Sequence, residues 1–499
     1  MNKLSRLTIN SLTIAGLFFI DKVVAFARTS IIAHQYASEV QTLDTFNAAN
    51  NLPDVLFALI SGGALAMAFI PLLTEYLTVK DRAAAWDLFS RVANVAFLIT
   101  ATFAIVISVF AAPIARMGIA PGFSEAQLVL LTELMRLNLV GTVIFSISGL
   151  VAASLQANQH FVMPALAPIM YNVGQIIGAY FLVPLFGVHG LVYGVILGAA
   201  MHLLIQVPML FKFGFRWTPS VNLRHTGLIE ALKLMAPRLL TMGGIQFIVL
   251  ARDNLASQLN QVGAVTALTY GWMIMQVPET ILGTAIATAM LPTLAEFASR
   301  GDWVGFRATI ERALRVLIAL TVPIAAVMAA GIAPLIRGVF GFDAATSQLV
   351  TMTTRAYLLT LTGYVIHEIA ARSFYARKEP MFPLYAVIIR LVIFLVIGWT
   401  GVTFFKSIGA PVIAFAEIAL LVEAIVLFGW LSKRTHEPIQ VGGAIWKGFV
   451  AALIGGGVSY VVAVYLPGGA ITTALLGMVA GGIVALVIVW SEAKQVFNL

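Results

Sequence analysis

Long apolar runs separated by short polar connections dominate the chain. A transmembrane helix needs about 20 predominantly apolar residues, and most of these runs reach that length. The pattern therefore predicts an all-α polytopic membrane protein with about fourteen transmembrane helices and no soluble domain. The predicted spans are residues 8–35, 45–71, 88–112, 127–155, 161–184, 188–211, 227–257, 264–294, 309–336, 346–374, 381–405, 408–432, 443–466 and 469–491.

The distribution of Lys and Arg predicts the orientation of these spans, because cytoplasmic loops carry an excess of positive charge. Basic residues fall mainly in the termini and the even-numbered loops, whereas Arg116, Arg337 and Lys406 fall in odd-numbered ones. We therefore expect both termini in the cytoplasm. Met1–Asn10 is basic, but the apolar stretch after it lacks a small-residue cleavage site, so we expect no cleavable signal peptide.

Composition agrees with a membrane protein and argues against several kinds of chemistry. Hydrophobic residues make up 60% of the chain and charged residues 10%, against about 25% charged in soluble proteins. The net charge of +8 reflects the loop asymmetry, so we expect no nucleic-acid partner. Cys is absent, the seven His are scattered, and we find no nucleotide-binding glycine loop or nucleophile–base pair. We expect no enzyme activity, no catalytic residue, no cofactor and no metal.

An internal repeat divides the apolar spans into two sets. Phe26–Arg28 recurs as Leu250–Arg252, and Leu52–Asp54 recurs as Val277–Glu279. Further matches pair Asp81 with Asp302 and Ala157 with Ala376. The nearly constant offset, about 220 residues, indicates a parallel repeat of six spans each.

The repeat predicts two pseudo-symmetric six-helix lobes plus two C-terminal helices. We expect the lobes at residues 1–215 and 216–435, and the additional helices at 436–499. Two such lobes around a central cavity are typical of transporters that bind their cargo between the repeats.

Charged residues in the first hairpin predict where the cargo binds. Asp21, Lys22, Arg28 and Asp54 interrupt apolar runs, and a charge near the bilayer centre costs roughly 2.5–3.5 kcal/mol. One interpretation is an internal ion pair that only fixes helix packing. The other, which the cluster as a whole favours, is a hydrated cationic cavity for a polar or anionic cargo.

Arg28 and its repeat mate Arg252 are the candidate phosphate-binding residues. Guanidinium binds phosphate bidentately and stays ionised, so one arginine from each lobe could hold a diphosphate. Asp21 lies two turns before Arg28, and Asp253 adjoins Arg252. Simple neutralisation by these acids is therefore the competing interpretation.

Two prolines inside spans are candidate gating positions. Pro53 precedes Asp54 and Pro278 precedes Glu279. A proline in a helix interior removes one backbone hydrogen bond and kinks the helix, and the freed carbonyls of Ala49 and Ile274 then need other partners. A static bend beside a capped acid is the alternative.

Other polar residues within the spans are left with open roles. Asp44 is either the N-cap of the second span or a functional acid. His367, Glu368, Arg372 and Arg390 are either partners between the lobes or residues that line the cavity.

The stretch Leu155–Phe161, continuing through Pro164–Pro168 to Asn172, closely resembles the corresponding loop and fifth span of the MurJ/MviN family of lipid II flippases, members of the MOP superfamily. Phe374–Arg377 followed by Pro383 resembles the repeat-related motif of that family. The resemblance covers nearly the whole chain. It implies a V-shaped pair of lobes, a cationic cavity for the lipid II head group, and a groove for the lipid tail at the two C-terminal helices.

Carried over by position, Arg28 matches a cavity arginine, Asp44 matches a functional acid, and Lys22 stands where the family usually has arginine. Three positions depart from the family pattern. Phe57 and Met273 replace arginines, and Gly62 replaces a glutamate.

The predicted function is therefore a flippase in the bacterial inner membrane that moves a polyprenyl-diphosphate-linked saccharide to the outer leaflet by alternating access. Its expected partners are this substrate, membrane lipids and cell-wall synthesis proteins. One alternative is a MOP exporter of another lipid-linked oligosaccharide or a small amphiphile, and another is a transport-inactive cell-wall scaffold. A membrane-embedded glycosyltransferase is disfavoured, because the outer loops are short and nearly free of acids.

Overall fold

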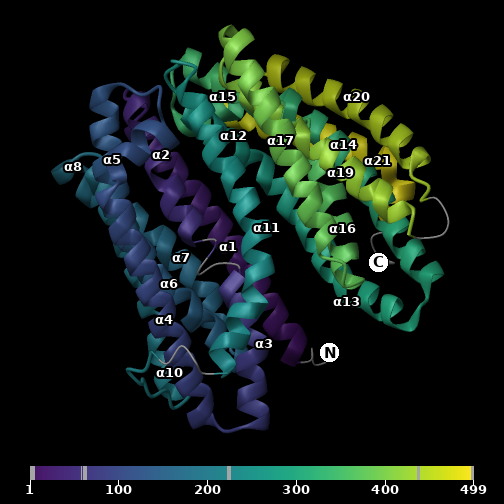
Figure 1. Cartoon of the computed structure of the whole chain (residues 1–499). Coiled ribbons are helices and arrows are strands. Elements are labelled where there is room, and N and C mark those ends of the chain that lie inside the picture. The colour runs from purple at the N-terminus through teal and green to yellow at the C-terminus, as the bar shows by residue number, and fades with distance from the viewer. Residues whose placement is uncertain (1–5, 58, 60–63, 222–225, 435–438, 496–499) are drawn as a thin grey trace. The chain divides into compact units, whose positions relative to one another are not determined.

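The computed structural model describes residues 6–57, 59, 64–221, 226–434 and 439–495 (Figure 1). Regular structure throughout this part of the chain is helical, with no strand. The all-α prediction is thus confirmed. The chain divides into two compact units, residues 1–250 and 251–499, and each is treated by itself below.

Unit 1 is helical along most of its described residues. Its helices are α1 (Arg6–Gln35), α2 (Val40–Phe57), α3 (Ala64–Val79), α4 (Arg82–Val109), α5 (Ala111–Pro113), the π-helical turn η2 (Ile114–Ile119), α6 (Glu125–Ala157), α7 (Val162–Ile177), the π-helical turn η3 (Gly178–Leu182), α8 (Val183–Phe186), α9 (His189–Leu204) and α10 (Val207–Lys212). The helix α11 (Thr226–Ser257) crosses the boundary between the units.

Unit 2 has the same all-helical character. Its helices are α12 (Ala264–Pro278), the π-helical turn η4 (Glu279–Thr284), α13 (Ala285–Arg300), α14 (Trp303–Phe340), α15 (Ala344–Leu358), α16 (Leu361–Ala376), α17 (Met381–Phe404), the 3₁₀ turn η5 (Lys406–Ile408), α18 (Ala410–Ala416), α19 (Ile418–Ser432), α20 (Gly442–Tyr465) and α21 (Ala470–Ala493).

Ten helical stretches in the described residues are long and apolar enough to cross a membrane. The tenth predicted span, residues 346–374, is divided between α15 and α16, and each of these helices is short. The chain is therefore a polytopic membrane protein. The count of fourteen spans and the boundaries at residues 215 and 435 stay predictions.

Local backbone features recur at the positions that the sequence repeat pairs. Asp81 caps α4 by accepting from the Ala84 amide at 2.7 Å, and Asp302 caps α14 by accepting from the Gly305 amide at 2.8 Å. Such caps satisfy the free donors of a first helical turn. The same cap hydrogen bond therefore occurs at both paired positions.

The turns after α6 and α16 also match. Gln159 and Lys378 both adopt left-handed backbone conformations, with φ values of 59° and 61°. In each turn the next amide bonds to a carbonyl five residues earlier, at 2.8 Å after α6 and 2.9 Å after α16. This pattern ends a helix and satisfies its last carbonyls.

Glycines bring α7 and α9 into backbone contact in unit 1. A Cβ on Gly174 would lie 2.3 Å from the Cα of Gly198, and a Cβ on Gly178 would lie 2.5 Å from the Cα of Gly194. Small residues allow such close approach of membrane helices. The helix α1 also packs on α7. The contact between α7 and α9 therefore determines which face of α7 is left to meet the charged part of α1.

The two C-terminal helices pack against α14 in unit 2. Ser459 of α20 donates to the carbonyl of Val327 at 2.9 Å, and Gly455 and Gly481 leave no space for a side chain where α20 meets α21. At one end of these helices, Glu492 accepts from Arg315 at 3.2 Å and from Lys447 at 2.9 Å. These contacts attach both helices to unit 2.

Candidate functional site

A hydrogen-bonded relay joins the charged residues of α1 to α7. Arg28 Nη1 donates to Asn172 Oδ1 at 2.8 Å, and Asn172 Nδ2 donates to Asp21 Oδ1 at 2.8 Å. Both acid and base are half-buried. The described contacts thus join Asp21 to Arg28 through the amide of Asn172. Sequence reasoning did not single out this amide for the site, although it lies in the stretch that carries the family resemblance.

Arg28 keeps unused donor capacity in this arrangement. Its Nη2 donates to Thr29 Oγ1 at 3.3 Å, but its buried Nε has no acceptor. Buried polar groups in native structures are nearly always paired, so a guanidinium with an open donor marks a place where an acceptor is expected to bind. Lys22, on the same helix, is exposed.

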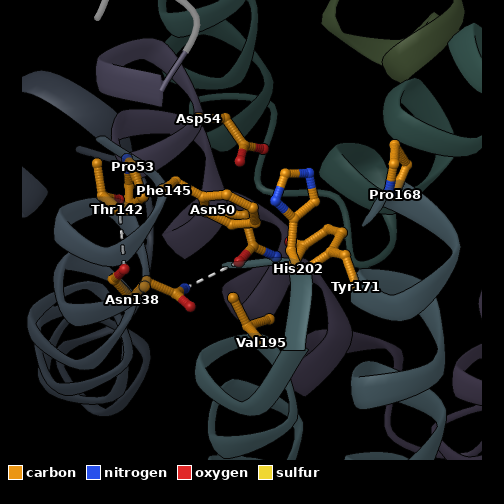
Figure 2. A pocket seen from close by; sticks show the side chains of 11 residues that line it. Asn50, Pro53, Asp54, Asn138, Thr142, Phe145, Pro168, Tyr171, Val195 and His202 are labelled. Atoms are coloured by element: carbon orange, nitrogen blue, oxygen red, sulfur yellow. Dashed lines mark hydrogen bonds between the residues drawn. The ribbon is translucent and has the colours of Figure 1, made fainter. Parts of the chain in front are cut away.

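A cavity of about 250 Å³ lies within unit 1, between α2, α6, α7 and α9. Figure 2 shows Asp54, Asn138, Tyr171 and His202 around it. The remaining lining residues are Asn50, Pro53, Gly141, Thr142, Phe145, Pro168 and Val195. Asp54 is exposed, and its carboxylate has no hydrogen bond within the described residues. The arrangement gives one acid an apolar and aromatic surround.

The cavity wall supplies the partner that the kink of α2 requires. Pro53 lies inside α2, and Asn138 Nδ2 donates to the freed carbonyl of Ala49 at 3.4 Å and to Asn50 Oδ1 at 2.8 Å (Figure 2). A side chain from α6 thus replaces the backbone donor that proline lacks. The prediction that Ala49 needs another partner is confirmed, and whether this helix gates transport stays a prediction.

Asp44 is not an N-cap. The helix α2 begins at Val40, so Asp44 lies one turn inside it, and its side chain is buried at 3% exposure. The cap alternative is therefore wrong, because the helix starts earlier than the apolar run suggested. The role of a functional acid stays a prediction.

In unit 2, Pro278 ends α12 and a π-helical turn follows. Glu279 opens this turn, is buried, and accepts from Thr284 at 2.9 Å and from Thr280 at 3.2 Å. π-helical turns occur frequently at functional sites. The hydroxyls satisfy the acid locally, which is the capped-acid alternative, and no contact tests gating.

Arg252 is buried and forms an ion pair with Asp253, the next residue in the chain. Its Nε donates to Asp253 Oδ1 at 2.7 Å, and the side chains are 8% and 0% exposed. This geometry is the one that the neutralisation alternative predicts. Contact between Arg252 and a phosphate stays a prediction. A single substitution of Arg252 tests it poorly, because it also breaks the ion pair with Asp253.

A buried ionic network occupies the interior of unit 2. Arg390 donates to Glu417 at 2.8 Å and lies 3.6 Å from Glu423, while His367 lies 3.3 Å from Glu423. The sequence left two roles open for these residues, pairing between the lobes and lining of the cavity. In the structure Arg390 and His367 take these partners within unit 2. Sequence reasoning missed Glu417 and Glu423, although two acids inside an apolar span were a usable signal.

Three residues differ from the family pattern, and the structure does not describe the side-chain position of two of them. Gly62 lies outside the described residues, and so does the side chain of Phe57. Met273 is half-buried in α12.

The turn between α6 and α7 carries a histidine of the resemblance motif. His160 packs edge-on against Phe213, with the ring centroids 6.1 Å apart. Burial, and then the positive charge of Lys212, lower the pKa of His160. A neutral imidazole therefore packs at this turn at physiological pH.

Comparison with known proteins decides the family. A sequence model described as lipid II flippase MurJ matches residues 38–488, which is most of the chain. This chain belongs to that family. The expectation from the 155–172 stretch is confirmed.

Relatives of the family are similar along almost their full length. The lipid II flippase MurJ of Burkholderia cenocepacia is 28% identical over 456 residues, covering 89% of this chain and 87% of the relative. The probable lipid II flippase MurJ of Vibrio cholerae is 25% identical over 465 residues, covering 89% and 88%. The family consists of transport proteins.

Solved structures share the fold. A lipid II flippase MurJ in an inward closed conformation matches with a TM-score of 0.80 at 21% identity, covering 97% of this chain and 98% of that one. An inward-facing multidrug resistance MATE transporter of the MOP superfamily matches with a TM-score of 0.73 at 14% identity, covering 85% and 98%. The fold is therefore that of MOP transporters.

Proposed function

We propose that this chain flips a polyprenyl-diphosphate-linked saccharide of the lipid II type from the inner to the outer leaflet by alternating access. Membership of the MurJ family supports the reaction and the substrate class. The observation that carries the proposal is the unused donor of Arg28 in α1, a helix that the sequence predicts to cross the membrane. A phosphate oxygen is the acceptor that guanidinium binds most strongly.

The relay from Asp21 through Asn172 gives this arginine a defined orientation. Binding is stronger when a donor is already held in place, because less side-chain entropy is lost. Lys22, Asp44 and Arg252 complete the proposed substrate-binding set. The gating set is Pro53 with Asp54 and Pro278 with Glu279.

The direction of transport depends on the orientation of the chain in a bacterial inner membrane. We infer that both termini are cytoplasmic from the loop charges. Accessibility tags at Lys212–Arg216 should report the cytoplasm, and a tag at Gly341 should report the outside. An external N-terminus would reverse the proposed direction. Cell-wall synthesis proteins are the expected partners.

The decisive experiment reconstitutes the purified protein into vesicles with fluorescent lipid II and measures the label in each leaflet. The wild type should move the label, and Arg28→Ala should slow it at least about tenfold, because a hydrogen bond to a charged group contributes about 1.5–3 kcal/mol. Arg116→Ala is the matched control, since Arg116 pairs with Glu125 at an exposed site. A wild type that leaves the label in one leaflet refutes the proposal.

The cavity of unit 1 favours one second candidate, a MOP exporter of a small amphiphile. Phe145 and Tyr171 pack edge to face, with centroids 5.0 Å apart, and present an apolar surface beside Asp54. An amphiphilic cation would suit this surround. Competition between such a compound and lipid II in the same vesicles distinguishes the two candidates.

A further inference from the structure

The interior of unit 2 holds six ionisable side chains that interact with one another, five of them buried and His367 half-buried. They are Arg252 and Asp253 of α11, His367 of α16, Arg390 of α17, Glu417 between α18 and α19, and Glu423 of α19. The side chain of Glu423 is 0% exposed, that of Glu417 4% and that of Arg390 5%. Charges so far from water must be balanced by one another.

Two of the acids in this network already have a cationic partner. Asp253 pairs with Arg252 at 2.7 Å, and Glu417 pairs with Arg390 at 2.8 Å. Tyr364 joins the second pair, because its hydroxyl accepts from Arg390 at 2.9 Å. Each of these pairs is neutral overall.

Glu423 is the acid left over. Its nearest cations are His367, with Nδ1 at 3.3 Å, and Arg390, with Nη1 at 3.6 Å, and Arg390 is already committed to Glu417. Both carboxylate oxygens of Glu423, and Nδ1 of His367, lack a hydrogen bond of good geometry. With a neutral imidazole the network carries one excess negative charge, and with an imidazolium it is balanced.

Most other charges on the elements that pack against α16 have partners of their own. On α16 itself Glu368 pairs with Arg372, which also interacts with Glu279 of η4. The charged residues of α17 and α19 are Arg390 and Glu423 alone. On α13, Glu296 pairs with Arg300, and α14 carries Arg307 paired with Glu311, Arg315 paired with Glu492, and also Arg312 and Arg337.

We propose that His367 and Glu423 form a binding site for one exchangeable proton, which holds α16 to α17 and α19 inside unit 2. His367 exchanges the proton, because its side chain keeps 13% exposure while Glu423 has none. Loss of the proton leaves two carboxylates against the single guanidinium of Arg390. The site needs no cargo, so it stands apart from the proposed flipping.

The test measures thermal unfolding of the full-length protein in detergent between about pH 6 and about pH 9, from near the ordinary histidine pKa of about 6.5 to well above it. The wild-type midpoint should fall as pH rises, because the proton is lost. Glu423→Gln removes the excess acid, so its midpoint should not fall as pH rises and should exceed that of the wild type at alkaline pH. His367→Gln should have a low midpoint throughout, and the double variant His367→Gln/Glu423→Gln should likewise show no fall at alkaline pH.

The chain offers a matched control histidine. His189 lies 3.1 Å from Glu133, but that pair is 31% and 52% exposed. His189→Gln should keep the wild-type pH dependence. Equal pH dependence in the wild type and Glu423→Gln overturns the proposal. A second result also overturns it. If sodium chloride restores the alkaline midpoint of the wild type alone and choline chloride does not, a metal ion and not a proton balances Glu423.

Discussion

Arg252 offers the sharpest test of the proposed phosphate-binding residues. It is either a counter-ion of the buried Asp253 or also a phosphate ligand, and a pair of variants distinguishes these two roles. Arg252→Ala leaves the Asp253 carboxylate, which is 0% exposed, without its cation. Removing one partner of a buried ion pair destabilises a protein by about 3–5 kcal/mol. The single variant should therefore lose both stability and flipping, whichever role the arginine has.

The double variant Arg252→Ala/Asp253→Asn removes both charges, so its thermal midpoint should return close to that of the wild type. If Arg252 also contacts the diphosphate, the double variant should still bind cargo at least about tenfold more weakly, which corresponds to a lost charge-assisted hydrogen bond of about 1.5–3 kcal/mol. Binding is read with fluorescent lipid II and flipping in vesicles, with Asp253→Asn alone as the control. Wild-type binding by a stable double variant refutes a phosphate contact and leaves Arg252 as a counter-ion.

Three further predictions use other features of the structure. Asn138→Ala should lower the free energy of unfolding by about 1–3 kcal/mol, because the Ala49 carbonyl loses its donor. Adding Pro53→Ala should recover part of this loss by restoring a backbone N–H, and additive losses in thermal unfolding would contradict this. The lowered pKa of His160 means that the unfolded state binds more protons, so stability should fall as pH drops through about 6.5, and His160→Gln should remove that part of the acid sensitivity in a pH series. Collapsing an inside-negative potential should slow flipping in vesicles, because outward movement of one negative charge gains roughly 2.3 kcal/mol per 100 mV, and an unchanged rate would argue against that coupling.

Features with a strong local signal were predictable from the sequence. The apolar runs indicated helices, and Pro53 indicated a carbonyl in need of a partner. Both signals depend on neighbours in the chain. The two six-helix lobes stay a prediction. The start of α2 at Val40 was not predictable in the same way, because Glu39–Leu43 has only two apolar residues and so does not extend the apolar run ahead of Asp44.

Partners distant in sequence were the main omission. Asn172 lies 144 residues from Arg28, and Asn138 lies 89 residues from Ala49. An amide inside an apolar span has no fixed periodicity, so only the packing of helices shows which group it meets. Glu417, Glu423 and Arg390 were all visible as charges in predicted spans, but the pairing of both acids with Arg390 was not.

The backbone contact between α7 and α9 makes these helices a fixed frame. Because Gly174 and Gly198 leave no gap for even a methyl group, neither helix can slide past the other without separating first. Asn172, two residues before Gly174, is thus an anchor point of constant position within unit 1. Arg28 and Asp21 are both tethered to this one anchor, so a displacement of α1 would have to break both hydrogen bonds at once, which makes their rupture an all-or-none event.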